Sequence, residues 1–236
     1  MATAFQNACN IVAATHRPLI KRQSMMIIVV AMVLLPLLIT ALLTLLVDKS
    51  FVDWLMQDMA SVVGAHPMTG AISSIGASVW LVTATVCMFS SLLCSKFNAR
   101  NKSFFLFWGA LLSFYLWFDD FFLLHEMIGY RFGLSEKIVF ASIALFTGIY
   151  LWCFRNLILS QSFLLLAAAL AFLATSIVVD TPMLFGEPGA FVLFLEESLK
   201  WLGISCWFGF FASTSFRLTS EAISSTTAPS AGPDAP

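Results

Sequence analysis

Ionisable side chains occur within segments of the chain that are otherwise apolar enough to cross a membrane. Placing a charge at the centre of a bilayer costs roughly 2.5–3.5 kcal/mol on insertion scales, so such groups are usually kept for a function. Carboxylates beside an imidazole and an ammonium can bind a hard cation, carry protons, or act as general acid and base. The candidate residues are Asp119, Asp120, His125, Glu126, Asp180, Glu196, Glu197 and Lys200.

The third apolar segment carries the first four of these residues. Asp119 and Glu126 are seven positions apart, which places them about 20° apart around an α-helix. Asp120 lies about a quarter turn to one side of this stripe, and His125 lies about a third of a turn to the other. If the segment is one helix, it presents two carboxylates to a common point, with two supporting groups beside them.

Glu196 and Lys200, in the last apolar segment, have the spacing of a helical ion pair. They are four positions apart with the glutamate first, and Glu197 is three positions before Lys200. Lys200 lies about half-way along this segment, too far from either end for its ammonium to reach the membrane surface easily. It therefore needs a partner within the helix bundle or must lose its proton. Asp180 closes the preceding apolar segment, one turn after Ser176.

The composition is typical of a membrane protein. The chain has 236 residues, of which 60% are hydrophobic and 11% are charged, whereas a soluble domain is about half apolar and a quarter charged. A net charge of −1 offers no field to attract nucleic acid, so no nucleic-acid partner is expected. A hydrocarbon core of ~30 Å needs about 20 helical residues. Six segments qualify: residues 25–47, 71–95, 103–128, 135–154, 161–179 and 189–215.

Lysine and arginine in the loops predict the orientation. With the N-terminus inside, the inner segments carry eight of these residues and the outer loops carry three, which favours an N-in, C-in arrangement. We therefore predict an all-α fold, a polytopic bundle of six transmembrane helices over residues 25–215. Residues 1–24 would form a cytoplasmic N-terminal segment, and the Ser-, Thr-, Ala- and Pro-rich residues 216–236 a disordered cytoplasmic tail. The expected location is the cell membrane, which is the inner membrane if the host is a bacterium.

The predicted topology brings the charged groups to one level of the membrane. The third and fifth segments leave the membrane outward and the sixth enters it from outside, so the candidate residues all fall in its outer half. We expect one site shared by these three segments. Its carboxylates outnumber its basic groups, and this surplus of negative charge calls for a metal ion, another cation or protonated carboxyls. The alternative is a set of ion pairs that only fixes the packing of the helices.

The leading functional hypothesis is a metal-dependent, membrane-embedded hydrolase that acts on a lipid or a lipid-linked substrate. Its catalytic residues would be Asp119, Glu196, Glu197 and Lys200. Several carboxylates with one imidazole would suit a single divalent metal ion as cofactor. The candidate metal ligands are Asp119, Asp120, His125, Glu126, Asp180 and Glu196.

Two further hypotheses belong to other classes of protein. The first is a proton- or cation-coupled transporter, for which intramembrane Asp, Glu, His and Lys are the usual parts. The second is an accessory subunit of a larger membrane complex, whose polar site meets a partner helix. The expected partners are accordingly the lipid bilayer, a lipid or small cation, and other membrane subunits. A retinal Schiff base on Lys200 is a further alternative, to which six predicted helices give no support.

The order of the candidate residues resembles a pattern found in uncharacterised bacterial multi-pass membrane proteins. The pattern is Asp-Asp-x4-His-Glu from Asp119, Ser-x3-Asp from Ser176, and Glu-Glu-x2-Lys-x2-Gly from Glu196 to Gly203. The resemblance covers roughly residues 100–215. It implies a six-helix membrane protein and brings no particular activity with it.

Overall fold

The structure is a computed structural model, and it describes residues 30, 34–35, 38–39, 41–46, 62–66, 68–125, 127–128, 133, 135, 137–180 and 189–227. For residues 180, 190, 226 and 227 only the backbone is described. The chain divides into two compact units, Met1–Thr69 and Gly70–Pro236. In the first unit residues 41–46 are helical, and most of the predicted first span and of the loop after it lies outside the described residues. Every candidate site residue belongs to the second unit.

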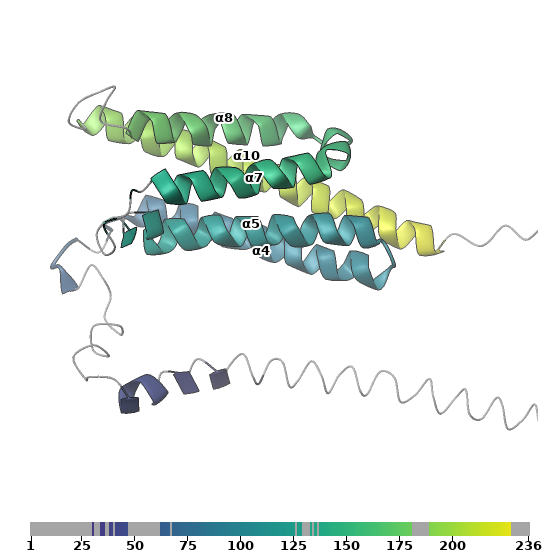
Figure 1. Cartoon of the computed structure of the whole chain (residues 1–236), viewed down its shortest axis with the longest axis horizontal. Coiled ribbons are helices and arrows are strands. Elements are labelled where there is room, and N and C mark those ends of the chain that lie inside the picture. Colours follow the sequence, from purple (N-terminus) through teal and green to yellow (C-terminus); the bar gives the residue numbers. More distant parts are fainter. Residues whose placement is uncertain are drawn as a thin grey trace, which may run out of the picture. The chain divides into compact units, whose positions relative to one another are not determined.

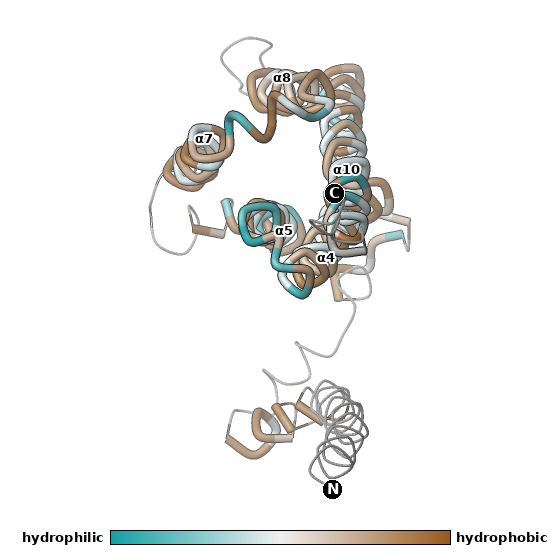
Figure 2. Tube along the Cα trace, turned by 90° about the vertical axis from the view of Figure 1, so that its right-hand side faces the viewer, coloured by the Kyte–Doolittle hydropathy of each residue, from teal (hydrophilic) through white to brown (hydrophobic). Residues whose placement is uncertain are grey.

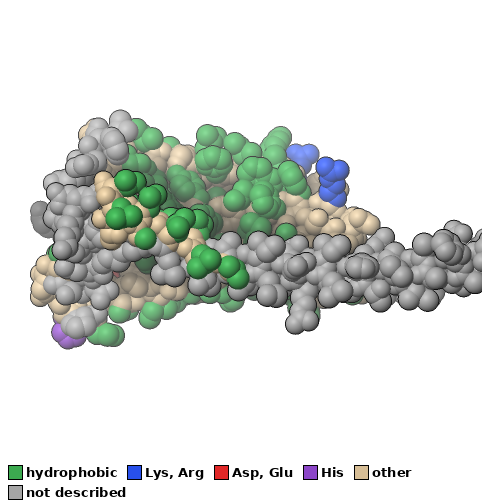
Figure 3. Space-filling view, turned by 90° about the horizontal axis from the view of Figure 1, so that it is seen from below, with side chains coloured by type: hydrophobic (Ala, Val, Ile, Leu, Met, Phe, Trp, Pro, Cys, Tyr) green, Lys and Arg blue, Asp and Glu red, His purple; other side chains and the backbone are tan. Residues whose placement is uncertain are grey.

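Helices are the only regular secondary structure in the described residues, as predicted. The second unit contains α4 (Ala71–Lys96), α5 (Arg100–Phe122), α7 (Lys137–Leu159), α8 (Phe163–Asp180) and α10 (Ala190–Thr227), which are shown in Figure 1. Three of them, α4, α5 and α7, are long and apolar enough to cross a membrane, whereas the apolar part of α8 is shorter. Hydrophobic side chains cover much of the described surface in Figure 3, and lysine and arginine gather towards one end. These features are typical of a membrane protein.

α5 ends at Phe122, earlier than the sequence predicted. Leu123 adopts a left-handed conformation, with φ 50° and ψ 46°, and its N–H donates to the carbonyl of Asp119. This conformation costs roughly 1–2 kcal/mol for a residue other than glycine, and the hydrogen bond of His125 to Asp119 just beyond the turn helps to offset that cost. The prediction of one continuous helix to residue 128 is therefore wrong, and Glu126, which was expected to share a face with Asp119, lies outside the described residues.

α10 is longer than predicted. It runs to Thr227, so residues 216–227, which were assigned to a disordered tail, are helical. This end of α10 is tied to the start of α5, because Nζ of Lys102 lies 2.7 Å from Oε2 of Glu221. Nε of Arg217 lies 3.1 Å from the other oxygen of the same carboxylate. One contact between residues far apart in the sequence and one within α10 thus stabilise a helix where composition alone indicates no structure.

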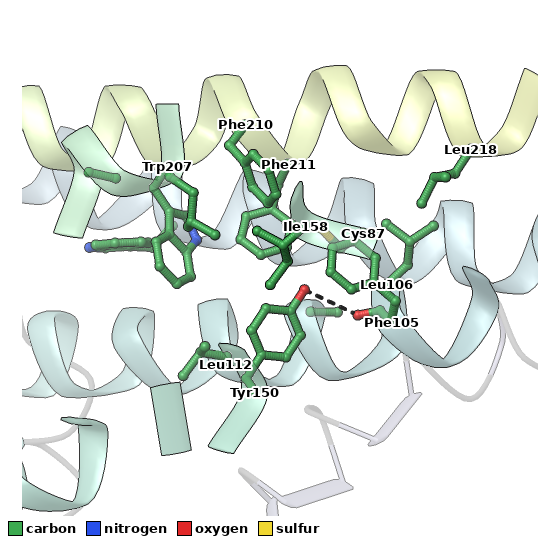
Figure 4. Close-up of a cluster of buried hydrophobic side chains, with 14 of the residues drawn as sticks. Cys87, Phe105, Leu106, Leu112, Tyr150, Ile158, Trp207, Phe210, Phe211 and Leu218 are labelled. Carbon is green, nitrogen blue, oxygen red and sulfur yellow. Dashed lines mark hydrogen bonds between the residues drawn. The ribbon is translucent and has the colours of Figure 1, made fainter. Parts of the chain in front are cut away.

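Aromatic side chains join α4, α5 and α10, which lie side by side in the end-on view of Figure 2. Trp80 of α4 meets Trp207 of α10 edge to face with ring centroids 5.6 Å apart, and Phe105 of α5 lies 6.3 Å from Phe211 of α10 (Figure 4). Gly109 of α5 makes room for Phe211, because a Cβ at Gly109 would lie 2.5 Å from Cε1 of that ring. α8 packs along α10. The packing of α5 on α10 positions the charged residues that both helices carry.

Candidate functional site

The end of α5 forms an aspartate–histidine pair. The side chain of Asp119 is only 9% exposed, and its Oδ1 accepts a hydrogen bond of 3.0 Å from the backbone N–H of His125. Nδ1 of His125 lies 3.1 Å from both carboxylate oxygens of Asp119. The pair exists because the helix stops at Phe122 and the chain turns back over its last turn. Helical spacing alone would have placed the two side chains on different faces.

Asp120 and Lys200 form an ion pair that links α5 to α10. The side chain of Asp120 is 9% exposed and that of Lys200 is 26% exposed, so the pair is largely buried. Lys200 was expected to need a partner in the bundle. The structure supplies one from α5, whereas the glutamates four and three positions before Lys200 lie on its own helix. Those two residues, Glu196 and Glu197, interact with Lys200 electrostatically. Since α10 has 38 residues, Lys200 lies in its first third rather than half-way along a span.

α8 reaches the same level through a backbone contact. Oγ of Ser176, which is buried, donates to the carbonyl oxygen of Glu196 over 3.3 Å. Residues from α5, α8 and α10 are therefore joined near one end of the bundle, by the Asp120–Lys200 pair and by this hydrogen bond. Of the remaining predicted site residues, Glu126 and the side chain of Asp180 lie outside the described part of the chain.

Three polar atoms in this region are buried and have no hydrogen-bond partner among the described residues. They are Oδ2 of Asp120, Oε2 of Glu197 and Nε1 of Trp201. An unpaired polar group in a protein interior costs about 1–3 kcal/mol, and a charged one costs more. The two oxygens are therefore the atoms at which a proton, a cation or a water molecule would bring the largest gain. Trp201 was not predicted, and its only signal in the sequence is its position one helical turn after Glu197.

The described donors do not form a metal centre by themselves. In the part of the chain that the structure describes, no group of three or more His, Cys, Asp or Glu side chains could hold a metal ion. Asp119 is instead paired with His125, and Asp120 with Lys200, so that each carboxylate faces a basic group. Two of the six predicted ligands, Glu126 and the side chain of Asp180, lie outside the described residues, and a divalent metal stays a prediction from the sequence.

A polar contact also connects α5 to α7, one helical turn before Asp119. The hydroxyl of Tyr115 lies 2.6 Å from Oγ of Ser142. Deeper in the bundle, Nε1 of Trp207 donates to Oγ of Ser113 over 3.0 Å, and this link between α10 and α5 is fully enclosed. The two contacts fix α5 against a helix on either side, and so limit how far Asp119 can move.

Residues 10–214 match the model of a family described as "Domain of unknown function (DUF8692)". The chain belongs to this family. No curated protein and no solved structure matches it. The DUF8692 match contains every candidate site residue, and it agrees with the resemblance to an uncharacterised family that the residue pattern indicated. The last third of α10, from Ser215 onward, lies beyond the matched region.

Proposed function

We propose that this DUF8692 protein is a multi-pass membrane protein of six spans, with both termini inside. We call the charged residues that α5 and α10 bring together near one end of the bundle the polar cluster, and propose that it is the proton-binding site of a proton- or cation-coupled transporter. The observation that carries the proposal is a pair of buried carboxylate oxygens, Oδ2 of Asp120 and Oε2 of Glu197, that have no hydrogen-bond partner in the described part of the chain. Both carboxylates act on Lys200, Asp120 as its ion-pair partner and Glu197 electrostatically.

An ion pair kept only for packing is expected to have its remaining hydrogen-bonding atoms satisfied. Here one ammonium is paired with Asp120 and is also acted on by Glu196 and Glu197, so negative charge is in excess when all four groups are ionised. An uncompensated charge is costly to bury, so a further positive charge at these groups would stabilise them. A proton on Glu197 or Asp120 would supply that charge, and either orphaned oxygen could carry it.

Uptake and release of this proton would change the partner of Lys200. When Glu197 holds the proton, Lys200 pairs with Asp120, which is the arrangement in the structure. When Glu197 is ionised, it competes for the ammonium from three positions earlier on the same helix. Because Asp120 and Lys200 join α5 to α10, this competition would couple protonation to the packing of two helices. A coupled transporter needs two alternative arrangements of its helices, and ion binding must shift the equilibrium between them.

The position of the cluster along α5 supports access from water. Asp119 and Asp120 lie in the last turn of the helix, which begins at Arg100. The rise from Arg100 to Asp120 is about 30 Å, close to the thickness of a hydrocarbon core. With the orientation predicted from the loop charges, the cluster is near the outer surface, and protons would enter from the outer aqueous phase.

Infrared spectroscopy of the purified protein in liposomes tests this proposal. The sample is titrated between about pH 5 and pH 9, the range in which buried carboxyl groups ionise. We expect a protonated-carboxyl band that disappears as the pH rises and that is missing from Glu197→Gln or Asp120→Asn. Glu221→Gln is the matched control, since Glu221 lies on the same helix but is paired with Lys102 and Arg217. That variant should retain the band.

Three results would overturn the proposal. If no carboxyl band titrates in the wild type, the cluster exchanges no proton and is not a coupling site. If a divalent metal copurifies in stoichiometric amount and is lost in Asp119→Asn/Glu196→Gln, the metal-dependent hydrolase becomes the better reading, with metal analysis as its measurement. Retention of the band in both Glu197→Gln and Asp120→Asn would place the proton on another residue.

A further inference from the structure

A groove runs between α5 and α7, starting about one helical turn below the polar cluster. Its larger part has a volume of about 620 Å³, and its walls are aromatic and aliphatic side chains from Phe104 to Tyr115 on α5 and from Phe146 to Phe154 on α7. A smaller part, of about 460 Å³, is lined by Arg100, Asn101 and Asn156 among others. The two parts have Phe104, Cys153 and Phe154 in common, so they form one continuous groove.

The dimensions of the groove match one leaflet of a bilayer. From Phe104 to Tyr115 the helix rises about 16 Å, which is about half of a ~30 Å hydrocarbon core. Arg100 is the first residue of α5, so the polar end of the groove lies where the helix meets the membrane surface. The groove is therefore apolar over the depth of one leaflet and polar at the level of the lipid head groups.

Arg100 lines this end of the groove and is available for an external anion. Its neighbour Lys102 is paired with Glu221 at 2.7 Å, and the guanidinium of Arg155 lies 5.0 Å from the centre of the Trp152 ring. Arg100 forms no ion pair with any carboxylate in the described part of the chain. A guanidinium matches the oxygens of a phosphate with two parallel hydrogen bonds, and the amides of the two asparagines could donate to the same group.

Contacts across the groove hold its two walls at a fixed distance. At the end near the polar cluster, Tyr115 of α5 is hydrogen-bonded to Ser142 of α7. At the floor, the ring of Tyr150 stacks on Phe105 with centroids 5.4 Å apart, and its hydroxyl donates to the carbonyl of Phe105 over 3.5 Å, as drawn in Figure 4. A preformed groove of this volume lies within the range of about 300–1,000 Å³ that is typical of small-molecule sites.

We propose that the groove binds one membrane phospholipid, with an acyl chain between α5 and α7 and its phosphate on Arg100. A single amphiphile of this kind satisfies the apolar walls and the unpaired guanidinium together. The chain's own N-terminal segment fits less well, because Lys21 and Arg22 precede the apolar residues 25–47. Those residues supply cations, whereas the guanidinium of Arg100 needs an anion. The proposal does not depend on the transport function.

Native mass spectrometry of the detergent-purified chain tests the proposal. The probes are phosphatidylglycerol and diacylglycerol, which has the same chains and no phosphate. We expect the wild type to retain one phosphatidylglycerol and to bind diacylglycerol at least about tenfold more weakly, the effect of losing one charge-assisted contact. Arg100→Gln should lose the preference, whereas Arg155→Gln, which removes a nearby arginine outside the groove, should keep it. Equal lipid retention by the two variants would overturn the assignment of the phosphate to Arg100.

A second measurement locates the acyl chain. Cys153 is exposed and lines both parts of the groove, whereas Cys87 and Cys94 are buried. In a Cys9→Ser/Cys206→Ser background, a maleimide should therefore react at Cys153, and phosphatidylglycerol should slow that reaction several-fold. If the lipid-free protein is already protected at Cys153, a part of the chain fills the groove and the proposal is wrong.

A matched pair of substitutions on α7 adds a steric control. Ile149 lines the groove, whereas Leu145, one turn earlier, is also exposed but does not line it. Ile149→Trp should displace the retained lipid, and Leu145→Trp should leave it bound. The opposite result, or loss of lipid in both variants, would contradict a chain lying between α5 and α7.

Discussion

Lys200 is the residue on which the polar cluster depends, because its ammonium is acted on by carboxylates from two helices. Its bond to Asp120 crosses from α10 to α5, while Glu197 acts on it from the same helix. Asp120 is buried, and the second oxygen of its carboxylate has no hydrogen-bond partner in the described part of the chain. Changes at this one side chain should therefore affect stability and protonation together.

Removing one partner of the Asp120–Lys200 pair should destabilise the protein more than removing both. Asp120→Asn leaves a buried ammonium without its carboxylate, and we expect a loss of about 2 kcal/mol. This is less than the 3–5 kcal/mol found for fully buried pairs, because Lys200 keeps 26% of its side chain exposed. Asp120→Asn/Lys200→Met should recover most of the loss. Unfolding of the four proteins of this double-mutant cycle in detergent micelles measures the coupling, and simple additivity of the two single losses would contradict it.

The sequence indicated the charged residues but not their partners. Asp119, Asp120 and Lys200 stand out because a charge in an apolar segment is rare. Their pairing depends on where α5 ends and how it is rotated against α10, and neither follows from local spacing. Leu123 gives no warning of a helix end, since leucine is a good helix former and neither glycine nor proline stands beside it. The orphaned atoms of Asp120 and Glu197 could be recognised only once the helices were packed.

At the level of the helices, apolar length predicted α4, α7 and α8 closely, while α10 was underestimated. Residues 216–227 are rich in serine and threonine, so composition favoured disorder. The bonds of Glu221 to Lys102 and Arg217 are tertiary and local contacts that add to helix stability there. Propensity is a weak guide where such contacts are present.

The C-terminal end of α10 should lose stability in acid through Glu221. Hydrogen bonds from Lys102, and then from Arg217, lower the pKa of Glu221 below its ordinary value of 4.5. Because the folded-state pKa is the lower one, this contribution is fully present above the ordinary value and is lost as the pH falls through the folded-state pKa. Thermal unfolding between about pH 6 and pH 3 should show a small acid-dependent loss that Glu221→Gln lacks. Identical pH profiles for the two proteins would show that the bonds contribute nothing to folding.

The contact of α5 with α10 should be sensitive to one methyl group at Gly109. A Cβ there would lie 2.5 Å from Cε1 of the buried Phe211 ring, which must then shift. We expect Gly109→Ala to cost about 1–3 kcal/mol, as in other overpacked cores. Gly148→Ala on α7 is the control, since nothing lies within 4 Å of its added methyl group. It should be neutral or slightly stabilising, because alanine favours a helix. Equal unfolding temperatures for the two variants would mean that Phe211 moves freely.

For the whole molecule, the proposed topology makes the two ends of α5 differ in environment. The polar cluster would face the outer side, and the proposed lipid site with Arg100 would face the inner side. Both sites lie in one unit of the chain, Gly70–Pro236, and share α5 as a wall. A ligand at one end and a proton at the other would thus act on the same helix.

The orientation can be tested with a membrane-impermeant maleimide. Native Cys9 lies in the predicted cytoplasmic segment and should react only after the cells are permeabilised. Ser135, the first residue of the predicted fourth span and therefore at its outer end, can be replaced by cysteine in a Cys9→Ser background, and Ser135→Cys should react in intact cells. Reaction of Cys9 in intact cells, or failure of Ser135→Cys to react there, would reverse the proposed placement of the polar cluster.

The ion pairs Lys102–Glu221 and Asp120–Lys200 both join α5 to α10, and along α5 they are separated by about 27 Å. That spacing is set by the rigid rise of a helix and cannot stretch when the surrounding membrane changes. In a much thicker bilayer, one of the two ion pairs would lie within the hydrocarbon core. In a much thinner bilayer, apolar side chains between the pairs would be exposed to water. Such hydrophobic mismatch costs fractions of a kcal/mol per ångström. The fixed distance between the two pairs would therefore favour membranes of one thickness. The chain length of the lipids would then affect how strongly α5 and α10 stay bound to each other.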